Sequence, residues 1–211
     1  MDARSAEVLR LLDRYLVEIV EAYELCPWAR AARDGGELAV EILWGHPALD
    51  AWIAAAVAAL ARPGTRVAMI VAPEFSGDPR ELRAVRDRVV AAIAGAGVAD
   101  FHPDAAPDLA TPARLVPHLR RAPDPLLQLV PLALLDSVRG APPVADLARQ
   151  AQLLVGGAVP ARGDVADRIA ETNHARVRAE AGAFAARLAE LAADRERSYA
   201  RVGISACRRR R

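Results

Sequence analysis

The segment TRVAMIVA, residues Thr65–Ala72, contains five consecutive apolar residues from Val67 to Val71. Arg62-Pro63-Gly64 precedes the segment and Pro73 follows it, so turn-forming residues bound it on both sides. A strand that is apolar on both faces is typical of the middle of a sheet covered on both sides. We therefore expect a central strand here, in a layered α/β protein.

The sequence on either side predicts alternating strands and helices. A strand over Glu37–Trp44 and a helix over Leu49–Ala61 precede the central strand, and a helix over Arg80–Ala94 and a short strand over Val98–Phe101 follow it. Gly95 and Gly97 are expected as C-cap residues of that second helix. Two successive strand–helix–strand units predict right-handed crossovers and parallel pairing.

The outer elements are helices and a fourth strand. We expect a first helix over Ser5–Glu24 with Ser5 as its N-cap, a fourth strand over Leu126–Val130, and short helices near Ala113–Leu119, Leu132–Arg139 and Pro142–Gly157. The fold class expected is therefore α/β, with a small, mostly parallel or mixed sheet of about four strands covered by helices.

A long C-terminal helix is expected over residues 164–197. Its apolar residues form one narrow stripe, composed of Val165, Ile169, Val177, Phe184, Leu188 and Leu191. Such a helix either packs across the α/β body or meets the same helix of a second copy, which would make a homo-oligomer through 164–197. The predicted organisation is an α/β core domain over 1–157, a helical extension over 158–200 and a disordered basic tail over 201–211.

Composition excludes several classes of protein. The 211 residues are 53% hydrophobic and 26% charged, which is typical of a soluble globular chain. All 28 basic residues are arginine, as a GC-rich genome favours, and 27 acidic residues oppose them, so no basic excess for nucleic acid exists. The longest apolar run, 51–61, is shorter than the roughly 20 residues of a membrane span, and the N-terminus lacks a signal core. With two cysteines only, we expect a cytoplasmic protein without membrane or nucleic-acid partners.

The common cofactor and catalytic motifs are absent from the sequence. No phosphate-binding glycine loop, dinucleotide fingerprint, serine-hydrolase elbow or zinc motif occurs. The sequence therefore identifies no cofactor.

The segment LCPWAR, Leu25–Arg30, contains the first candidate residues. Arg30 could stabilise the thiolate of Cys26 and make it a nucleophile. A helix C-terminus disfavours a thiolate, however, and unpaired cysteines are commonly buried wall residues. Both roles remain open for Cys26.

The segment DFHPD, Asp100–Asp104, lies at the carboxyl end of an expected strand, where open α/β sheets bind ligands. Asp100, His102 and Asp104 would share one side of an extended chain, and the two carboxylates would raise the pKa of His102. His102 would then act as a general acid or base with Asp104 beside it. The alternative is a histidine that caps the strand–loop junction by bonding to a backbone carbonyl.

A metal site is a further alternative at the same segment. His102 and Asp104 supply two thirds of a two-histidine, one-carboxylate iron site, which His118 or His174 could complete.

Adjacent arginines follow on a proline-rich segment. Arg120 and Arg121 could bind a carboxylate or phosphate, with Arg30 as a further substrate-binding residue. The alternative is that they are solvated or paired with Asp124. The polar cluster from Glu171 to Arg176, which holds the only asparagine of the chain, Asn173, is interpreted as a solvated helix face.

Three of these segments resemble a known family. Leu25–Arg30, Phe101–Asp104 and Arg121–Pro125, in this order, resemble the uncharacterised bacterial family called domain of unknown function 1415, with its motifs LCPF-A-K, FHPD and N-R-S-P-x-P. The resemblance covers about Leu9 to Arg139. It implies that Cys26, His102, Asp104 and Arg121 occupy motif positions, and that Pro27, Pro103, Pro123 and Pro125 shape the backbone.

The chain departs from that family at four positions. Arg30 replaces a lysine, Arg120 an asparagine, Gln128 a histidine and Pro131 an arginine. A family site that used those residues would be altered here, and the family has no assigned activity to transfer.

Two hypotheses follow. In the first, Cys26, His102 and Arg121 converge on a small anionic substrate of an enzyme or binding protein. In the second, a non-catalytic protein self-associates or binds a partner through its C-terminal helix.

Overall fold

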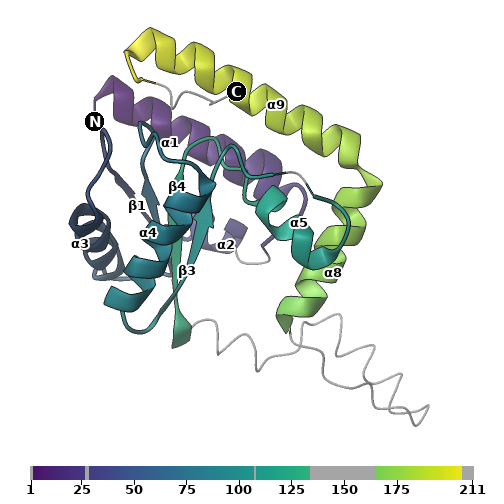
Figure 1. Ribbon diagram of the computed structural model, residues 1–211, viewed down its shortest axis with the longest axis horizontal. Coiled ribbons are helices and arrows are strands. Elements are labelled where there is room, and N and C mark those ends of the chain that lie inside the picture. Colours follow the sequence, from purple (N-terminus) through teal and green to yellow (C-terminus); the bar gives the residue numbers. More distant parts are fainter. Residues whose placement is uncertain (1, 27–28, 107, 134–164, 206–211) are drawn as a thin grey trace.

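The computed structural model describes residues 2–26, 29–106, 108–133 and 165–205 (Figure 1). The helices expected over Leu132–Arg139 and Pro142–Gly157 lie almost entirely outside these residues, as does the end of the basic tail, 206–211.

Within the described residues, four strands form one mixed sheet, which confirms the expected α/β class. The strands β1 (Leu38–Ile42), β2 (Val67–Val71), β3 (Ala96–Phe101) and β4 (Leu126–Pro131) lie in the order β1-β2-β4-β3. β1 and β2 pair in parallel, and β4 runs antiparallel to both of its neighbours. As expected, β2 occupies a central position.

The expected parallel pairing of β2 with β3 is wrong, because β4 lies between them. The sequences explain the order. Leu126, Leu127 and Leu129 of β4 are all buried, which requires cover on both faces of that strand. β3 contains Gly97 and Asp100, which suit an edge position better.

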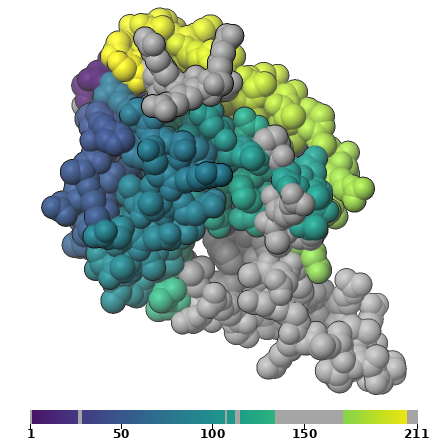
Figure 2. Space-filling model, in the orientation of Figure 1, coloured from purple at the N-terminus to yellow at the C-terminus, as the bar shows by residue number. Residues whose placement is uncertain are grey.

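Helices cover both faces of the sheet. α3 (Leu49–Leu60) and α4 (Pro79–Ala92) pack on one face, with Trp52 and Leu82 fully buried against Ile70. In the space-filling view α3 and α4 occupy the left and centre of the face shown, and α9 runs along its upper and right border (Figure 2). α4 begins with a capping box between Asp78 and Glu81.

The N-terminal helix contains an irregularity that its sequence did not predict. It runs as α1 (Ala3–Tyr15) and continues as a π-helix, η1 (Leu16–Glu21). Asp2 is the N-cap in place of the expected Ser5, whose backbone N–H donates to the Asp2 carboxylate at 2.9 Å. After η1 the chain bends at Glu24, which has a φ of 50°, and the short helix α2 (Ala29–Asp34) follows.

The expected long C-terminal helix is two helices, α8 (Val165–Ala179) and α9 (Ala181–Val202), which meet at Glu180. The bend lets Val177 of α8 and Phe184, Leu188 and Leu191 of α9 enter one core cluster with α1. The stripe residues Val177, Phe184, Leu188 and Leu191 therefore pack across the body, which is one of the two arrangements expected, and self-association through 164–197 stays a prediction (Figure 1).

The structure describes the first five residues, 201–205, of the expected C-terminal tail. Arg201 and Val202 complete α9, and Ile204, only 5% exposed, belongs to the core cluster, so the expected disordered tail does not begin at residue 201. None of the helices among the described residues combines the length and apolar character that a bilayer crossing requires.

Candidate functional site

His102 follows β3 directly and is almost fully buried, with 2% of its surface exposed. Its Nδ1 accepts a hydrogen bond from the backbone N–H of Asp104 at 3.1 Å, so the proton of the neutral ring is on Nε2. Nε2 then donates to the carbonyl oxygen of Gly77 at 3.0 Å. Both ring nitrogens therefore bond to backbone, as in the alternative in which His102 caps the strand–loop junction.

The electrostatic prediction for His102 is wrong in sign. Burial lowers the pKa of His102, and the nearby carboxylates of Asp104, Asp78 and Asp100 oppose this shift without reversing it. Carboxylates close in sequence suggested a cationic ring, but the exclusion of water outweighs them.

Gly77, whose carbonyl oxygen contacts His102, lies in a tightly packed turn. A Cβ atom at this position would lie 2.5 Å from the Phe75 ring and 2.6 Å from Glu81 Oε2. Any other residue would therefore require the Phe75 ring and the Glu81 carboxylate to move.

The geometry gives no support to an iron site. Both nitrogens of His102 are engaged, and His174 Nε2 lies 2.9 Å from the Leu109 carbonyl oxygen. The His118 ring packs against Phe184. Within the part of the chain that the structure describes, no group of three histidine, cysteine, aspartate or glutamate side chains could hold a metal ion.

The segments around His102 and Arg121 are in direct contact. The His102 backbone N–H donates to the Arg120 carbonyl oxygen at 3.0 Å, and Arg121 Nε donates to the Pro103 carbonyl oxygen at 3.1 Å. Arg121 thus fastens one loop to the other, and Asp104 lies exposed beside them. Arg30 is on the surface, where it pairs with Glu21 at 3.2 Å.

A pocket lies between the sheet and the helical layer that holds α1, η1, α2, α5 (Pro112–Leu119) and α8. Its volume is about 390 Å³, within the roughly 300–1,000 Å³ typical of small-molecule sites. Most of its lining is apolar: Tyr15, Leu16, Val20, Leu25, Ala29, Ala32, Leu38, Val67, Met69, Ala99, Phe101, Val116, Leu119 and Leu126. The remaining lining residues are Cys26, Arg33, Arg120, Gln128 and Asn173.

Two arginines line this pocket, and their surroundings differ. Arg33 Nε donates to Glu21 Oε1 at 2.7 Å, so its charge is neutralised. The Arg120 guanidinium lies 5.7 Å from the centre of the Phe101 ring and forms no ion pair or side-chain hydrogen bond with any described residue. Asp100, which acts on it electrostatically, is hydrogen-bonded to Arg86 at 3.0 Å. Burial lowers the pKa of Arg120, because a charge held away from water is destabilised.

Of the six residues predicted for a site, the pocket brings together Cys26 and Arg120. His102, Asp104, Arg121 and Arg30 do not line it. Gln128 has no role predicted from the sequence, and Asn173 is expected on a solvated helix face. The one hint in the sequence is that Asn173 is the only asparagine of the chain.

The interpretation of residues 171–176 as a solvated face is wrong for its central residues. Asn173 is 6% exposed, and its Nδ2 donates to the Leu25 carbonyl oxygen at 3.1 Å. Arg176 donates to the Tyr23 carbonyl oxygen at 3.0 Å and pairs with Glu24 at 2.6 Å. α8 therefore holds the bent segment after η1, which forms one wall of the pocket.

Comparisons with protein-family models, with curated proteins and with solved structures found no match for this chain. The chemistry of the pocket is therefore the basis for assigning a function.

Proposed function

We propose that the protein binds a small, largely apolar molecule that carries one carboxylate, and that Arg120 is the counterion of that carboxylate. The observation that carries the proposal is a guanidinium without an acidic partner among the described residues, on the wall of an apolar pocket. Partly buried charges are ordinarily paired, because removal from water costs several kcal/mol. A ligand carboxylate would supply the missing partner through two parallel hydrogen bonds.

The composition of the pocket favours one negative charge on the ligand. Arg33 is already neutralised by Glu21, which leaves one uncompensated cation on the wall. A phosphate or a dicarboxylate would place a second negative charge against apolar side chains such as Met69 and Leu126. A monocarboxylate with a hydrocarbon or aromatic body matches both the charge and the lining.

The other predicted residues support the pocket in this proposal. Cys26 forms part of the wall, next to Leu25. His102 positions the loop from which Arg120 extends, since its backbone N–H holds the Arg120 carbonyl oxygen. Arg121 fastens that same loop through the Pro103 carbonyl.

Calorimetric titration with decanoate tests the proposal, with decanol as the uncharged comparison. We expect decanoate to bind and decanol to bind at least tenfold more weakly, because a hydrogen bond to a charged group contributes about 1.5–3 kcal/mol. Arg120→Met should weaken decanoate binding by about ten- to a hundredfold and leave decanol unaffected. Arg120→Lys, which keeps the charge, should restore part of the affinity.

Arg88→Met is the matched control, because it removes one positive charge from an exposed position of α4, outside the pocket. Its affinity for decanoate should equal that of the unmodified protein. Equal loss in Arg88→Met and Arg120→Met, or equal binding of decanol and decanoate, would refute the proposal.

A further inference from the structure

Asn173 offers the pocket a second polar contact besides Arg120. Its amide orientation is determined by the Leu25 carbonyl oxygen, which can only accept a hydrogen bond and therefore faces Nδ2 at 3.1 Å. Oδ1 is left as a pure acceptor, and no described residue donates a hydrogen bond to it. The side chain is 94% buried yet lines the pocket, so the pocket is where a donor could reach Oδ1.

The second amide of the pocket differs from Asn173. Gln128 lies on the floor, in register with Met69 of β2 and Ala99 of β3, and is only partly buried. Its amide can rotate to donate or to accept, so it imposes no fixed requirement on a ligand. Asn173 cannot adapt in this way without leaving the Leu25 carbonyl unpaired, which costs about 1–3 kcal/mol in a buried place.

Arg120 and Asn173 belong to separate walls of the pocket. Arg120 follows α5 and lies over Phe101 of β3, whereas Asn173 projects from α8 beside the segment after η1. One bound molecule could therefore meet both residues with two different groups, with its apolar body against the sheet between them.

We infer that the ligand class is a carboxylic acid that also carries a hydrogen-bond donor, a hydroxyl or an amide N–H, which donates to Asn173 Oδ1. This inference rests on the proposed function and narrows it from apolar carboxylates to hydroxy acids or N-acyl amino acids. A plain fatty acid would bury the Asn173 oxygen without a partner, and sites with such a buried polar group discriminate against ligands that lack the matching one.

A series of decanoates with one hydroxyl group at successive carbon atoms tests the inference against decanoate itself. We expect one member to bind the unmodified protein about five- to tenfold more tightly than decanoate, as one additional hydrogen bond allows. The methyl ether of that member should lose the gain, because it can no longer donate. This comparison needs no protein variant, so it stands even if a substitution disturbs folding.

Asn173→Leu should abolish the gain, so that the hydroxylated member and decanoate bind this variant with the same affinity. Arg176→Met is the matched control: it removes another contact of α8 with the same segment, from a residue that does not line the pocket. The Arg176→Met variant should still bind the hydroxylated member more tightly than decanoate. The Gln128→Leu variant should do so as well.

The possible failures are distinguishable. If decanoate binds but no hydroxylated member binds more tightly, or the methyl ether binds as tightly as its parent, the inference is overturned and the proposed function stands. Loss of the gain in Gln128→Leu but not in Asn173→Leu also overturns it. Absence of binding by every decanoate overturns both.

Discussion

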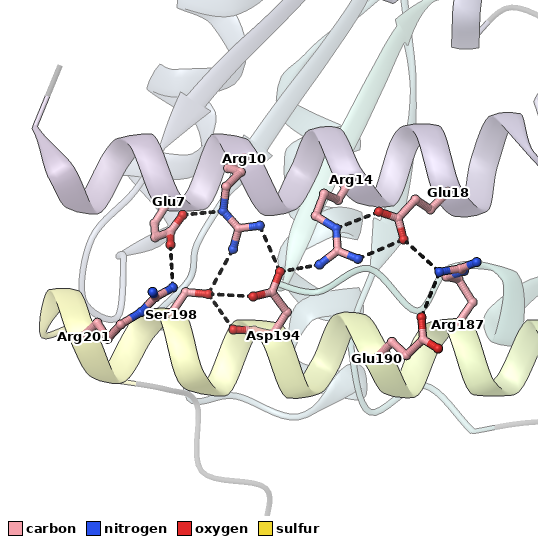
Figure 3. Close-up of polar contacts among 9 residues, drawn as sticks. All are labelled: Glu7, Arg10, Arg14, Glu18, Arg187, Glu190, Asp194, Ser198 and Arg201. Carbon is pink, nitrogen blue, oxygen red and sulfur yellow. Dashed lines mark hydrogen bonds and ion pairs between the residues drawn. The ribbon is translucent and has the colours of Figure 1, made fainter.

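Charged side chains occur in two contrasting settings in this protein. Between α9 and the continuous helix formed by α1 and η1, four arginines and four acidic residues form a continuous set of ion pairs, which we call the ionic seam: Glu7, Arg10, Arg14, Glu18, Arg187, Glu190, Asp194 and Arg201 (Figure 3). In the pocket, Arg120 has no carboxylate partner among the described residues. The seam carries balanced charge and serves the fold, whereas the pocket holds a charge that the fold does not use.

The seam also contains a carboxylate, Asp194, whose charge is fully paired with arginines. Asp194 accepts hydrogen bonds from Arg10 at 2.9 Å and from Arg14, and these contacts lower its pKa to about 2. The pKa of Arg120 also falls, but because of burial. The ion pairs therefore stabilise the charged form of Asp194, whereas burial destabilises the charged form of Arg120. The contrast shows that ion-pair partners, rather than exposure alone, distinguish the arginines of the seam from Arg120, for which we propose a ligand carboxylate as partner.

The largest effect is expected where a paired charge is fully buried. Arg195 and Asp124, 8% and 2% exposed at their side chains, pair at 2.7 Å, and the Tyr199 hydroxyl donates to the second Asp124 oxygen. Arg195→Met should lower the free energy of unfolding by about 3–5 kcal/mol, because it leaves a buried carboxylate without its cation. Urea denaturation at neutral pH measures this. If the free energy of unfolding fell by less than about 1 kcal/mol, the buried Arg195–Asp124 pair would contribute no more than a partly exposed ion pair of the seam.

An intermediate effect is expected from the unpartnered imidazole of His118. This residue is 5% exposed, its Nδ1 has no hydrogen-bond partner among the described residues, and burial together with the charge of Arg121 lowers its pKa. The unfolded chain takes up this proton below a pH of about 6.5, before the folded chain does. Stability should therefore fall as the pH decreases through that value, by at most about 1.4 kcal/mol per pH unit for each such histidine.

Urea denaturation between pH of about 7.5 and 5.5 checks this, since carboxylates titrate mainly below that window. His118→Phe should reduce the slope, and the remainder belongs to His102, whose pKa is also lowered by burial. An unchanged slope in His118→Phe would contradict the prediction.

The smallest effects are expected when one arginine from each setting is replaced by methionine. Arg14→Met should destabilise the protein by about 1 kcal/mol, because Glu18 and Asp194 lose a partner. Arg120→Met should stabilise it by a similar amount, since it replaces an uncompensated charge with an apolar side chain in an apolar wall. High salt should shrink the Arg14 effect by screening. Equal signs for the two substitutions would remove the distinction between seam and pocket.

The local structure of this chain could largely be predicted from its sequence, but long-range pairing could not. The continuous apolar run in β2 indicates a central strand whatever lies next to it. The insertion of β4 between β2 and β3 depends on contacts between Ile70 and Leu127 and between Val98 and Leu129, which no local pattern reveals. The bend at Glu180 likewise depends on long-range packing, because α8 packs on α5 whereas α9 packs on α1.

The candidate site divides in the same way. Two of the residues singled out by their chemistry, Cys26 and Arg120, line one pocket, and their predicted roles stay predictions, whereas the expected rise in the pKa of His102 is wrong. The charges near His102 are visible in sequence, whereas its burial and its bond to Gly77, 25 residues away, are not. Asn173 could not be placed, because its partner Leu25 is 148 residues distant.

The packing of α9 on α1 has a consequence for synthesis on the ribosome. Arg10 and Asp194 are 184 positions apart, so at roughly 5–20 residues per second the first helix emerges about 10–40 seconds before its partner is translated. During that interval the apolar side chains of Val8, Leu11 and Tyr15 lack their native cover. A nascent chain of this protein should therefore be a client of chaperones that shield apolar helices, and the part of the pocket wall that Asn173 provides is absent until α8 has been made.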